Sequence, residues 1–316
     1  MSPSGVAPLG PTDLPQADRS LPAKGGKGIS LHEMSRLAGI SSLILNGSRF
    51  CAFSLRAGLG ALLHGGWNIG IRCLLSPVQY WRFPVFPALL EELDPRPGDR
   101  ILDIGSPKLP SVYLVLQRGG TVYATDLQDE LIFEWIACVR ALDRSGACEG
   151  RYIVERQDAR HLAYPEGFFD KVYSISVLEH IPEDGDAQAM REIERVLKRG
   201  GRAFIQVPFR PRYEEVFVAQ NVYGRTYNGT ARVFFERHYD TPTLASRIIG
   251  ASALRLVNLS FHRERWPFSA YWFRLPFAVR VPFMWLEPLW AMVFLARTGD
   301  AKAPGARGAY LTFQKE

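Results

Sequence analysis

The sequence predicts an α/β fold built on a doubly wound, mostly parallel sheet. Strand-like apolar runs alternate with helical segments through the middle of the chain, and most of these runs end in an acidic residue, serine or proline. Such alternation is typical of a parallel sheet whose crossover helices cover both faces. A chain of 316 residues with 47% hydrophobic composition can also bury an ordinary globular core.

The first half of the expected sheet contains three strands joined by two helices. The runs "RILDIG" (100–105) and "TVYATD" (121–126) flank a helix that Gly119-Gly120 ends. A second helix (129–146) leads to the strand "RYIVERQDA" (151–159). This part of the chain therefore predicts consecutive βαβ units.

The second half adds two parallel strands and a final antiparallel pair. The run "FDKVYSISVLEHI" (169–181) is a buried strand entering a helix, and the amphipathic helix "AQAMREIERVLKRGG" (187–201) precedes the strand "RAFIQVPF" (202–209). The runs "LRLVNLSFHRE" (254–264) and "GAYLTFQK" (308–315) have the pattern of a closing hairpin. We expect a doubly wound Rossmann-like sheet with a C-terminal antiparallel hairpin.

Composition divides the chain into four parts. A tail rich in Pro, Gly and Ser lacks the apolar core of a signal peptide and is expected to be disordered. An N-terminal helical region, a cofactor-binding domain in two stretches and a helical, aromatic-rich insertion follow it. These parts are residues 1–30, 31–92, 93–264 with 307–316, and 265–306. Within the domain, residues 210–240 predict an ordered flap or hairpin.

Cysteine spacing and charge exclude several classes of protein. Cys51, Cys73, Cys138 and Cys148 lie far apart without a C-x-x-C pair, which disfavours a zinc cage or disulfide framework and suits reduced thiols in a cytoplasmic protein. The formal net charge is +6, with basic flanks and a mildly acidic middle. Because the basic residues are mixed with apolar ones, we expect no nucleic-acid partner. The sequence does not indicate an oligomeric state.

Two flanking segments are unusually apolar and aromatic, at 48–75 and 265–297. Arg56, His64 and Arg72 interrupt the first, and arginines, prolines and Glu287 interrupt the second. Neither segment therefore forms the run of about 20 apolar residues that a spanning helix needs. Aromatic rings interleaved with arginine suit a segment lying in the interface of an anionic membrane, and hence a peripheral membrane protein. A helical cap packed on the core, or a dimer contact, explains the same composition, and both interpretations stay open.

The expected strand ends are the places to look for chemistry. In a doubly wound sheet, ligands bind beyond the carboxyl ends of the strands, near the switch in strand order. Those ends carry Asp103-Ile104-Gly105, Asp126, Asp158-Ala159, Ser176 and Pro208. Any one of these acids also suits a helix N-cap, but acids at successive strand ends favour a binding site.

The order of short motifs resembles the class I S-adenosylmethionine-dependent methyltransferases, particularly the methyltransferase type 11 group. The series is "LDIG", "ATDLQ", "QDARHL", "FDKVYSISVLEHI" and "REIERVLKRGGRAFIQVP", and the resemblance covers about residues 93–209. It implies S-adenosylmethionine as cofactor. A nicotinamide site would need the G-x-G-x-x-G fingerprint, of which only Gly105 is present.

The resemblance also implies roles for particular residues. Gly105 would let the methionine part of the cofactor approach the backbone beside Asp103. Asp126 would accept hydrogen bonds from the ribose hydroxyls, and Asp158 from the adenine amino group. Leu127 would cover the adenine ring, with the Ala159 N–H facing it. Ser176, at the end of the fourth strand, would also bind the cofactor.

The glycine loop departs from the family pattern. Pro107 and Leu109 stand where the family has its second and third glycines, so the loop is stiffer and has one donor fewer. A proline at the start of a helix is acceptable, because the N–H there is unsatisfied anyway. Lys108 and Arg82 are candidates to bind the cofactor carboxylate through charge-assisted bonds.

We therefore expect methyl transfer from S-adenosylmethionine to a hydrophobic small-molecule or lipid-like acceptor. His180 is the first candidate for a general base and His238 the second, although His180 also suits a purely orienting role. Ser176 stands where metal-binding relatives have an acid, so we expect no metal. The alternative is a non-catalytic binding or assembly module, which Pro107 and Leu109 favour.

Overall fold

The computed structural model describes residues 31–64, 66–127, 129–143, 145–218 and 232–316. The chain divides into two compact units, Met1–Gly39 and Ile40–Glu316, and the second unit contains the sheet.

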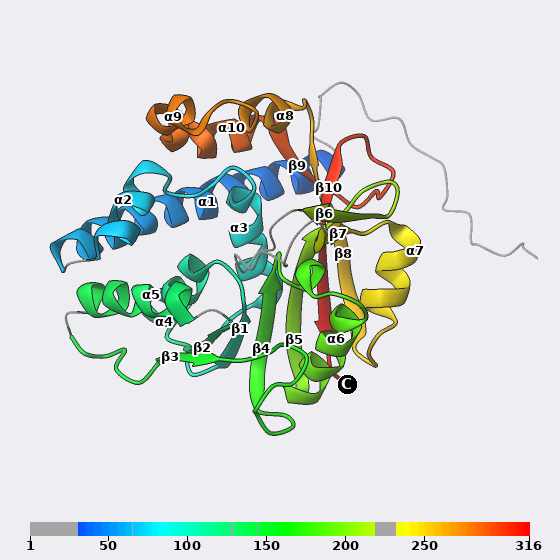
Figure 1. Ribbon diagram of the computed structural model, residues 1–316, viewed down its shortest axis with the longest axis horizontal. Coiled ribbons are helices and arrows are strands. Elements are labelled where there is room, and N and C mark those ends of the chain that lie inside the picture. The colour runs from blue at the N-terminus through cyan, green and yellow to red at the C-terminus, as the bar shows by residue number, and fades with distance from the viewer. Residues whose placement is uncertain (1–30, 65, 128, 144, 219–231) are drawn as a thin grey trace, which may run out of the picture. The chain divides into compact units, whose positions relative to one another are not determined.

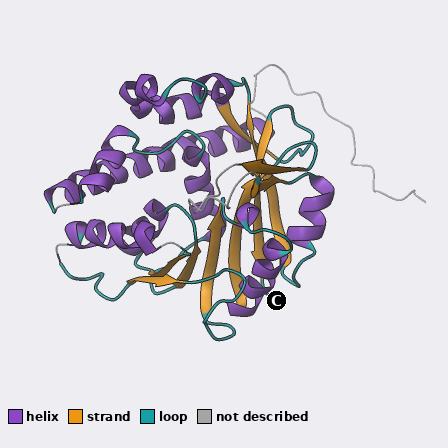
Figure 2. Cartoon of the chain, viewed as in Figure 1, coloured by secondary structure: helices purple, strands orange, loops and turns teal. Residues whose placement is uncertain are grey.

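An eight-stranded sheet forms the centre of the second unit, with helices on both of its faces (Figure 2). The strand order is β3-β2-β1-β4-β5-β10-β8-β9, in which the first five strands are parallel and the last three are antiparallel. This confirms the expected doubly wound sheet and its C-terminal antiparallel pair. The strands are β1 (Arg100–Ile104), β2 (Thr121–Asp126), β3 (Tyr152–Arg156), β4 (Phe169–Ile175), β5 (Leu197–Pro208), β8 (Arg255–Glu264), β9 (Leu295–Thr298) and β10 (Ala306–Gln314).

One element boundary and one additional strand differ from the sequence-based expectation. The helix expected over 187–201 ends at Val196, and β5 begins at the next residue. Leu197 pairs with Phe169 of β4, and the Gly200 N–H donates to the Lys315 carbonyl at 2.7 Å. These long-range partners keep the stretch extended. The strand β9 was not expected, and it lengthens the antiparallel part of the sheet by pairing with β8.

Alternating residues of each strand enter different cores. In β1, Ile101 packs into one hydrophobic cluster while Leu102 and Ile104 pack into the other. The first cluster includes residues of α3 (Arg82–Leu93), α4 (Lys108–Arg118) and α5 (Asp129–Leu142), and the second includes residues of α6 (Gly185–Val196) and α7 (Thr241–Leu244). Figure 1 shows these two groups of helices on either side of the sheet.

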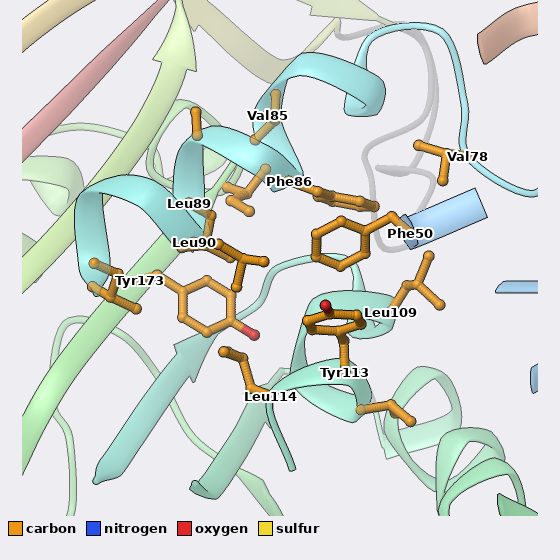
Figure 3. Close-up of a cluster of buried hydrophobic side chains, with 14 of the residues drawn as sticks. Phe50, Val78, Val85, Phe86, Leu89, Leu90, Leu109, Tyr113, Leu114 and Tyr173 are labelled. Carbon is orange, nitrogen blue, oxygen red and sulfur yellow. The ribbon is translucent and has the colours of Figure 1, made fainter. Parts of the chain in front are cut away.

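The N-terminal helices join the first cluster through aromatic contacts. From α1 (Leu31–Leu63), the Phe50 ring lies 4.4 Å from Tyr113 of α4 and 5.3 Å from Phe86 of α3, measured between ring centroids. Leu109, in the place of a family glycine, packs beside them (Figure 3). The second helix, α2 (Trp67–Leu75), lies against the aromatic segment that precedes β9.

That aromatic segment folds into short helices, of which α8, α9 and α10 are labelled at the top of Figure 1. They are α8 (Phe268–Trp272), α9 (Phe277–Arg280), η3 (Val281–Leu286) and α10 (Glu287–Phe294). Two buried glutamates tie the segment to the residues before α3. The Tyr80 hydroxyl donates to Glu264 Oε1 at 2.9 Å, and the Tyr80 N–H donates to Glu287 Oε2 at 2.9 Å.

The stretch Phe277–Phe294 is long and apolar enough to cross a membrane by length and composition, and 17% of it is buried. Three short helices make it up, so it is not one continuous α-helix.

The expected flap contains a two-stranded antiparallel hairpin of β6 (Glu214–Val218) and β7 (Val233–His238). Residues 219–231, which join the two strands in the sequence, lie outside the described residues. The Tyr239 N–H donates to the Pro208 carbonyl at 3.1 Å, which holds the base of the hairpin against the end of β5. The hairpin therefore lies at the edge of the sheet where ligands are expected.

Candidate active site at the carboxyl ends of the strands

The loop after β1 is held together by a buried ion pair. Lys108 Nζ lies 3.0 Å from Asp103 Oδ2 and also donates to the Thr125 carbonyl at 3.0 Å. The Asp103 carboxylate also accepts from the Ser106 N–H at 3.1 Å and from the Ser111 hydroxyl. Asp103 is fully buried and Lys108 is 4% exposed. Asp103 and Lys108 therefore neutralise each other's charge inside the protein.

Gly105 is required by its own conformation and by its neighbour. Its φ is +59°, in the left-handed region that favours glycine, and a Cβ at this position would lie 2.9 Å from Val177 Cγ1. Ser106 then connects two strands, because its Oγ accepts from the Ile175 N–H at 2.9 Å. The loop thus keeps the backbone turn of a glycine-rich site while its serine and lysine fill the interior.

The parallel pairing of β1, β2 and β3 brings the other expected cofactor residues to one edge. Asp126 ends β2, and Leu127, directly after it, is 38% exposed. Asp158 follows β3, and Ala159 is buried beside it. The Arg160 guanidinium, whose Nη2 lies 2.6 Å from Asp158 Oδ2, lowers the pKa of that carboxyl and keeps it ionised. A carboxylate and an apolar surface therefore lie next to each other, as a ribose and an adenine ring require.

A cavity of about 640 Å³ opens beyond β4 and β5. Arg82, at the start of α3, donates from Nη1 to Ser176 Oγ at 2.9 Å, and Ser176 Oγ donates to Gln206 Oε1 at 2.8 Å. Ser176 has φ +54°, an uncommon backbone conformation for a residue other than glycine, and such residues cluster at functional sites. Arg82 and Ser176, which the sequence predicts to bind the cofactor, both line the cavity.

The two candidate bases differ in their position. His238 lines the cavity, and its Nε2 lies 2.9 Å from Glu236 Oε1. His180 instead bonds through Nδ1 to the Phe235 carbonyl at 2.7 Å, and its Nε2 lies 3.9 Å from Glu236 Oε2. The geometry therefore favours His238, which the sequence ranked second, and gives His180 a contact that fixes the flap strand β7.

Glu179 is a buried acid beside this cluster. Burial raises its pKa to about 8, with Glu236 adding to the shift and Arg82 opposing it. Its Oε2 has no hydrogen-bond partner. Glu179, His180 and Glu236 offer metal-ligand atoms within 4.8 Å of one another. The cluster is a buried carboxyl that favours its protonated form beside a histidine–glutamate pair, and a cation bound there would have to displace that proton.

Several residues of this site were missed by the sequence analysis. Glu236 could have been found, because it stands two residues before His238 in "FFERH" and therefore shares a strand face with it. His262, Arg210, Arg280 and Arg307 also line the cavity. They come from separate segments, and no local pattern unites them.

Comparison with known proteins identifies the central part of the chain. Residues 102–205 match the family model described as "Methyltransferase domain". A stretch of 175 residues is 33% identical to methyltransferase GfsG of Streptomyces halstedii and covers 54% of this chain and 59% of that protein. Another of 120 residues is 31% identical to the 27-O-demethylrifamycin SV methyltransferase of Amycolatopsis mediterranei (strain S699), covering 36% and 41% respectively. The chain thus spans less than two thirds of the length of these relatives.

Solved structures show a more distant likeness. An S-adenosylmethionine-dependent methyltransferase from Methanosarcina mazei aligns with a TM-score of 0.47 and 16% identity, over 72% of this chain and 97% of its own. The MccD protein aligns with a TM-score of 0.49 and 11% identity, over 76% and 99%.

The parallel strands and the closing antiparallel strands form a Rossmann-like sheet. Within it, residues 102–205 match a methyltransferase domain. The expected family and its cofactor, S-adenosylmethionine, are confirmed.

The raised pKa of Glu179 predicts how stability depends on pH. Because the folded protein holds this proton more tightly than the unfolded chain does, the stability is fully present below about pH 4.5 and is lost as the pH rises towards about 8. Glu179→Gln should remove this loss and be more stable than the wild type at pH 9 by a few kcal/mol, as measured by urea unfolding at pH 5, 7 and 9.

The matched control is Glu149→Gln, at an exposed acid, which should leave the pH dependence unchanged. A constant difference between Glu179→Gln and the wild type across the three pH values would show that Glu179 ionises normally.

Proposed function

We propose that the protein transfers the methyl group of S-adenosylmethionine to a hydrophobic small molecule held in the 640 Å³ cavity. One observation carries this proposal: Arg82 and Ser176, two of the residues that we propose for the cofactor, line the cavity. When bound, S-adenosylmethionine supplies an activated sulfonium methyl group, so the protein has mainly to align the acceptor and exclude water.

The described residues suit this cofactor. Asp126 is the group we propose for the ribose, with Leu127 and Asp158 for the adenine ring. Gly105 and Ala159 provide close backbone approach. Arg82 is the candidate partner of the cofactor carboxylate, and its hydrogen bond to Ser176 keeps the guanidinium at the end of β4. Lys108 is already neutralised by Asp103, which leaves Arg82 as the better candidate of the two.

Transfer to a hydroxyl also requires a proton acceptor, and the His238–Glu236 pair provides one. If His238 Nε2–H donates to Glu236 Oε1, the lone pair lies on Nδ1. Glu214 Oε2 lies 3.5 Å away and would stabilise the positive charge of a protonated ring, on which Nδ1 is a buried nitrogen without a hydrogen-bond partner. We propose that Nδ1 takes the acceptor's proton while the new bond to the methyl carbon forms and the bond from that carbon to sulfur breaks.

The relatives support a natural-product type of acceptor. The name of the second relative gives a demethylrifamycin as the acceptor of that protein. The cavity of the present chain is roofed by the aromatic insertion, from which Phe273, Phe277 and Met284 line it. This lining suits a large apolar molecule, including a lipid-like one, better than a small polar metabolite.

We further propose that the insertion and α2 contact the surface of an anionic membrane. The insertion exposes Phe283 by 49% and Trp285 by 57%, and Trp67 at the start of α2 is 65% exposed. Arg72 and Arg274, also exposed, supply positive charge on the same segments. Rings with neighbouring arginines match a headgroup region in which anionic lipid attracts the cations.

The alternative function is a non-catalytic binding or assembly module with this fold. The self-contained Asp103–Lys108 loop favours it, because that loop is complete without a ligand. Cofactor binding decides between the two functions.

Calorimetric titration with S-adenosylmethionine and S-adenosylhomocysteine should give micromolar affinity, about −8 kcal/mol. Asp126→Ala should weaken binding at least about tenfold, because hydrogen bonds to a charged group are lost. Asp300→Ala, which removes an exposed acid from the loop before β10, should bind normally. If neither ligand gives binding heat or thermal stabilisation, the proposed methyltransferase function is wrong and the non-catalytic binding module is the better description.

The two histidines can be separated by a matched pair of variants, His238→Gln and His180→Gln. Methyl transfer from labelled S-adenosylmethionine to a panel of hydroxylated lipids and macrolides should fall about 10²-fold or more in His238→Gln, since a positioned base is lost. Its affinity for S-adenosylmethionine should not change. A larger loss of transfer in His180→Gln would make His180 the base.

Membrane contact predicts sedimentation with vesicles of phosphatidylcholine and phosphatidylglycerol, and weaker sedimentation with phosphatidylcholine alone. The double variant Phe283→Ala/Trp285→Ala should lower vesicle binding at least about tenfold, because each buried ring contributes about 1.5–3 kcal/mol. Val257→Ala, at an exposed position of β8, should bind like the wild type. Equal sedimentation of the wild type, the double variant and Val257→Ala would contradict membrane contact through the insertion.

A further inference from the structure

Four arginines from distant parts of the chain line the 640 Å³ cavity. They are Arg82, Arg210, Arg280 and Arg307. Among the residues that the structure describes, no carboxylate lies within 4.0 Å of any of their nitrogens, whereas several surface arginines do form such pairs. Arg82 is satisfied in part by Ser176. The other three present their charge to the cavity without an anionic partner.

The two acids that line the same cavity do not balance this charge. Glu236 is bonded to His238 at 2.9 Å. Glu287 accepts from the Tyr80 N–H at 2.9 Å and from Trp272 Nε1 at 2.8 Å, so its carboxylate is committed to anchoring the insertion. The cavity therefore carries an excess of positive charge at the place where the acceptor is proposed to bind.

Unsatisfied polar atoms in the lining also indicate a ligand. His262 is 5% exposed and lines the cavity, and its Nδ1 has no hydrogen-bond partner. Burial, together with Arg82 and Arg307, lowers the pKa of His262 to about 3, so the ring is neutral. Arg280 Nε is likewise buried without a partner. Buried polar groups are normally satisfied, and a polar ligand group would satisfy these.

An apolar second cavity continues from the first. Its volume is about 380 Å³, and it shares Gln79, Arg82, Phe277 and Met284 with the larger cavity. The rest of its lining is mostly apolar and includes Ile69, Cys73, Leu75, Phe86, Leu109 and Trp135. A ligand that spans both cavities would have one strongly polar end and one apolar end.

We infer that the acceptor is an anionic amphiphile, whose carboxylate or phosphate is bound by Arg210, Arg280 and Arg307 and whose apolar chain occupies the second cavity. Guanidinium groups suit this task, because their paired N–H donors match the oxygens of either anion. The inference rests on the proposed function, since it describes the acceptor of that same site.

Binding to the full chain can be measured by calorimetry below the micellar concentration of each probe. Dodecanoate and dodecyl phosphate should bind at least about tenfold more tightly than dodecanol or dodecyltrimethylammonium, because only the anions gain charge-assisted bonds. Acetate should bind far more weakly than dodecanoate, since it has no chain to occupy the apolar cavity. Equal affinity for the anionic, neutral and cationic chains would overturn the inference.

Two matched pairs of variants test the two ends of the ligand. Arg280→Gln and Arg307→Gln should each weaken dodecanoate binding about tenfold, whereas Arg191→Gln, at an exposed position of α6, should not. Ile69→Phe should weaken dodecanoate more than hexanoate by filling the apolar cavity. Ile71→Phe, at a 47% exposed position of the same helix, should leave both affinities unchanged. Unchanged binding in both Arg280→Gln and Arg307→Gln would overturn the inference even if Ile69→Phe does not fold.

Titration with S-adenosylmethionine on the same preparation separates this inference from the proposed function. If the protein binds the cofactor but shows no preference for anionic chains, the inference is wrong and the proposed methyltransferase function still stands. Arginine-dependent dodecanoate binding without cofactor binding supports the anionic site and contradicts the enzyme. Binding to phosphatidylglycerol vesicles without binding of free dodecanoate assigns the charge to a lipid surface and overturns the inference.

Discussion

The site depends on the buried ion pair between Asp103 and Lys108. Two charges removed from water are tolerated only when they neutralise each other and find further hydrogen bonds, which Ser106, Ser111 and the Thr125 carbonyl provide. The pair fixes the turn after β1 without the usual glycines. It also directs Leu109 into the cluster around Phe50, where that side chain forms part of the wall of the apolar cavity. One electrostatic contact thus connects the cofactor edge, the N-terminal helix and the acceptor region.

A second pair of buried charges holds the roof of the cavity. Glu264 accepts from the Tyr80 hydroxyl and from Ser269, and Glu287 accepts from the Tyr80 N–H and from Trp272. These bonds connect the segment before α3 with the helices of the insertion. Because a buried carboxylate without partners is costly, the insertion cannot move away without exposing or orphaning both acids. The segment that lines the cavity is therefore an integral part of the fold.

The sequence predicted those parts of the fold that local residue patterns and the order of elements along the chain determine. The runs from Arg100 to Asp126 show the alternation of a βαβ unit, and the structure reproduces it. The sequence did not predict those parts that depend on contacts between residues far apart in the chain. Leu197 is a strand residue because Phe169 lies opposite it, and Glu287, which read as a break in an apolar segment, is an internal anchor. The arginines of the cavity come from four segments, and only the folded chain places them together.

Two groups of side chains around the insertion lack partners of matching polarity. Phe283 and Trp285 are exposed to solvent, while Arg280 and Arg307 line the cavity without an anionic partner among the described residues. Apolar rings in water lack a cover, and guanidinium groups in a recess lack the full hydration of a surface. An anionic lipid could satisfy both groups of side chains. Its apolar part would cover the exposed rings, and its charged group would bind the arginines. An acceptor that arrives from a lipid surface and enters with its charged group first would meet both requirements in turn.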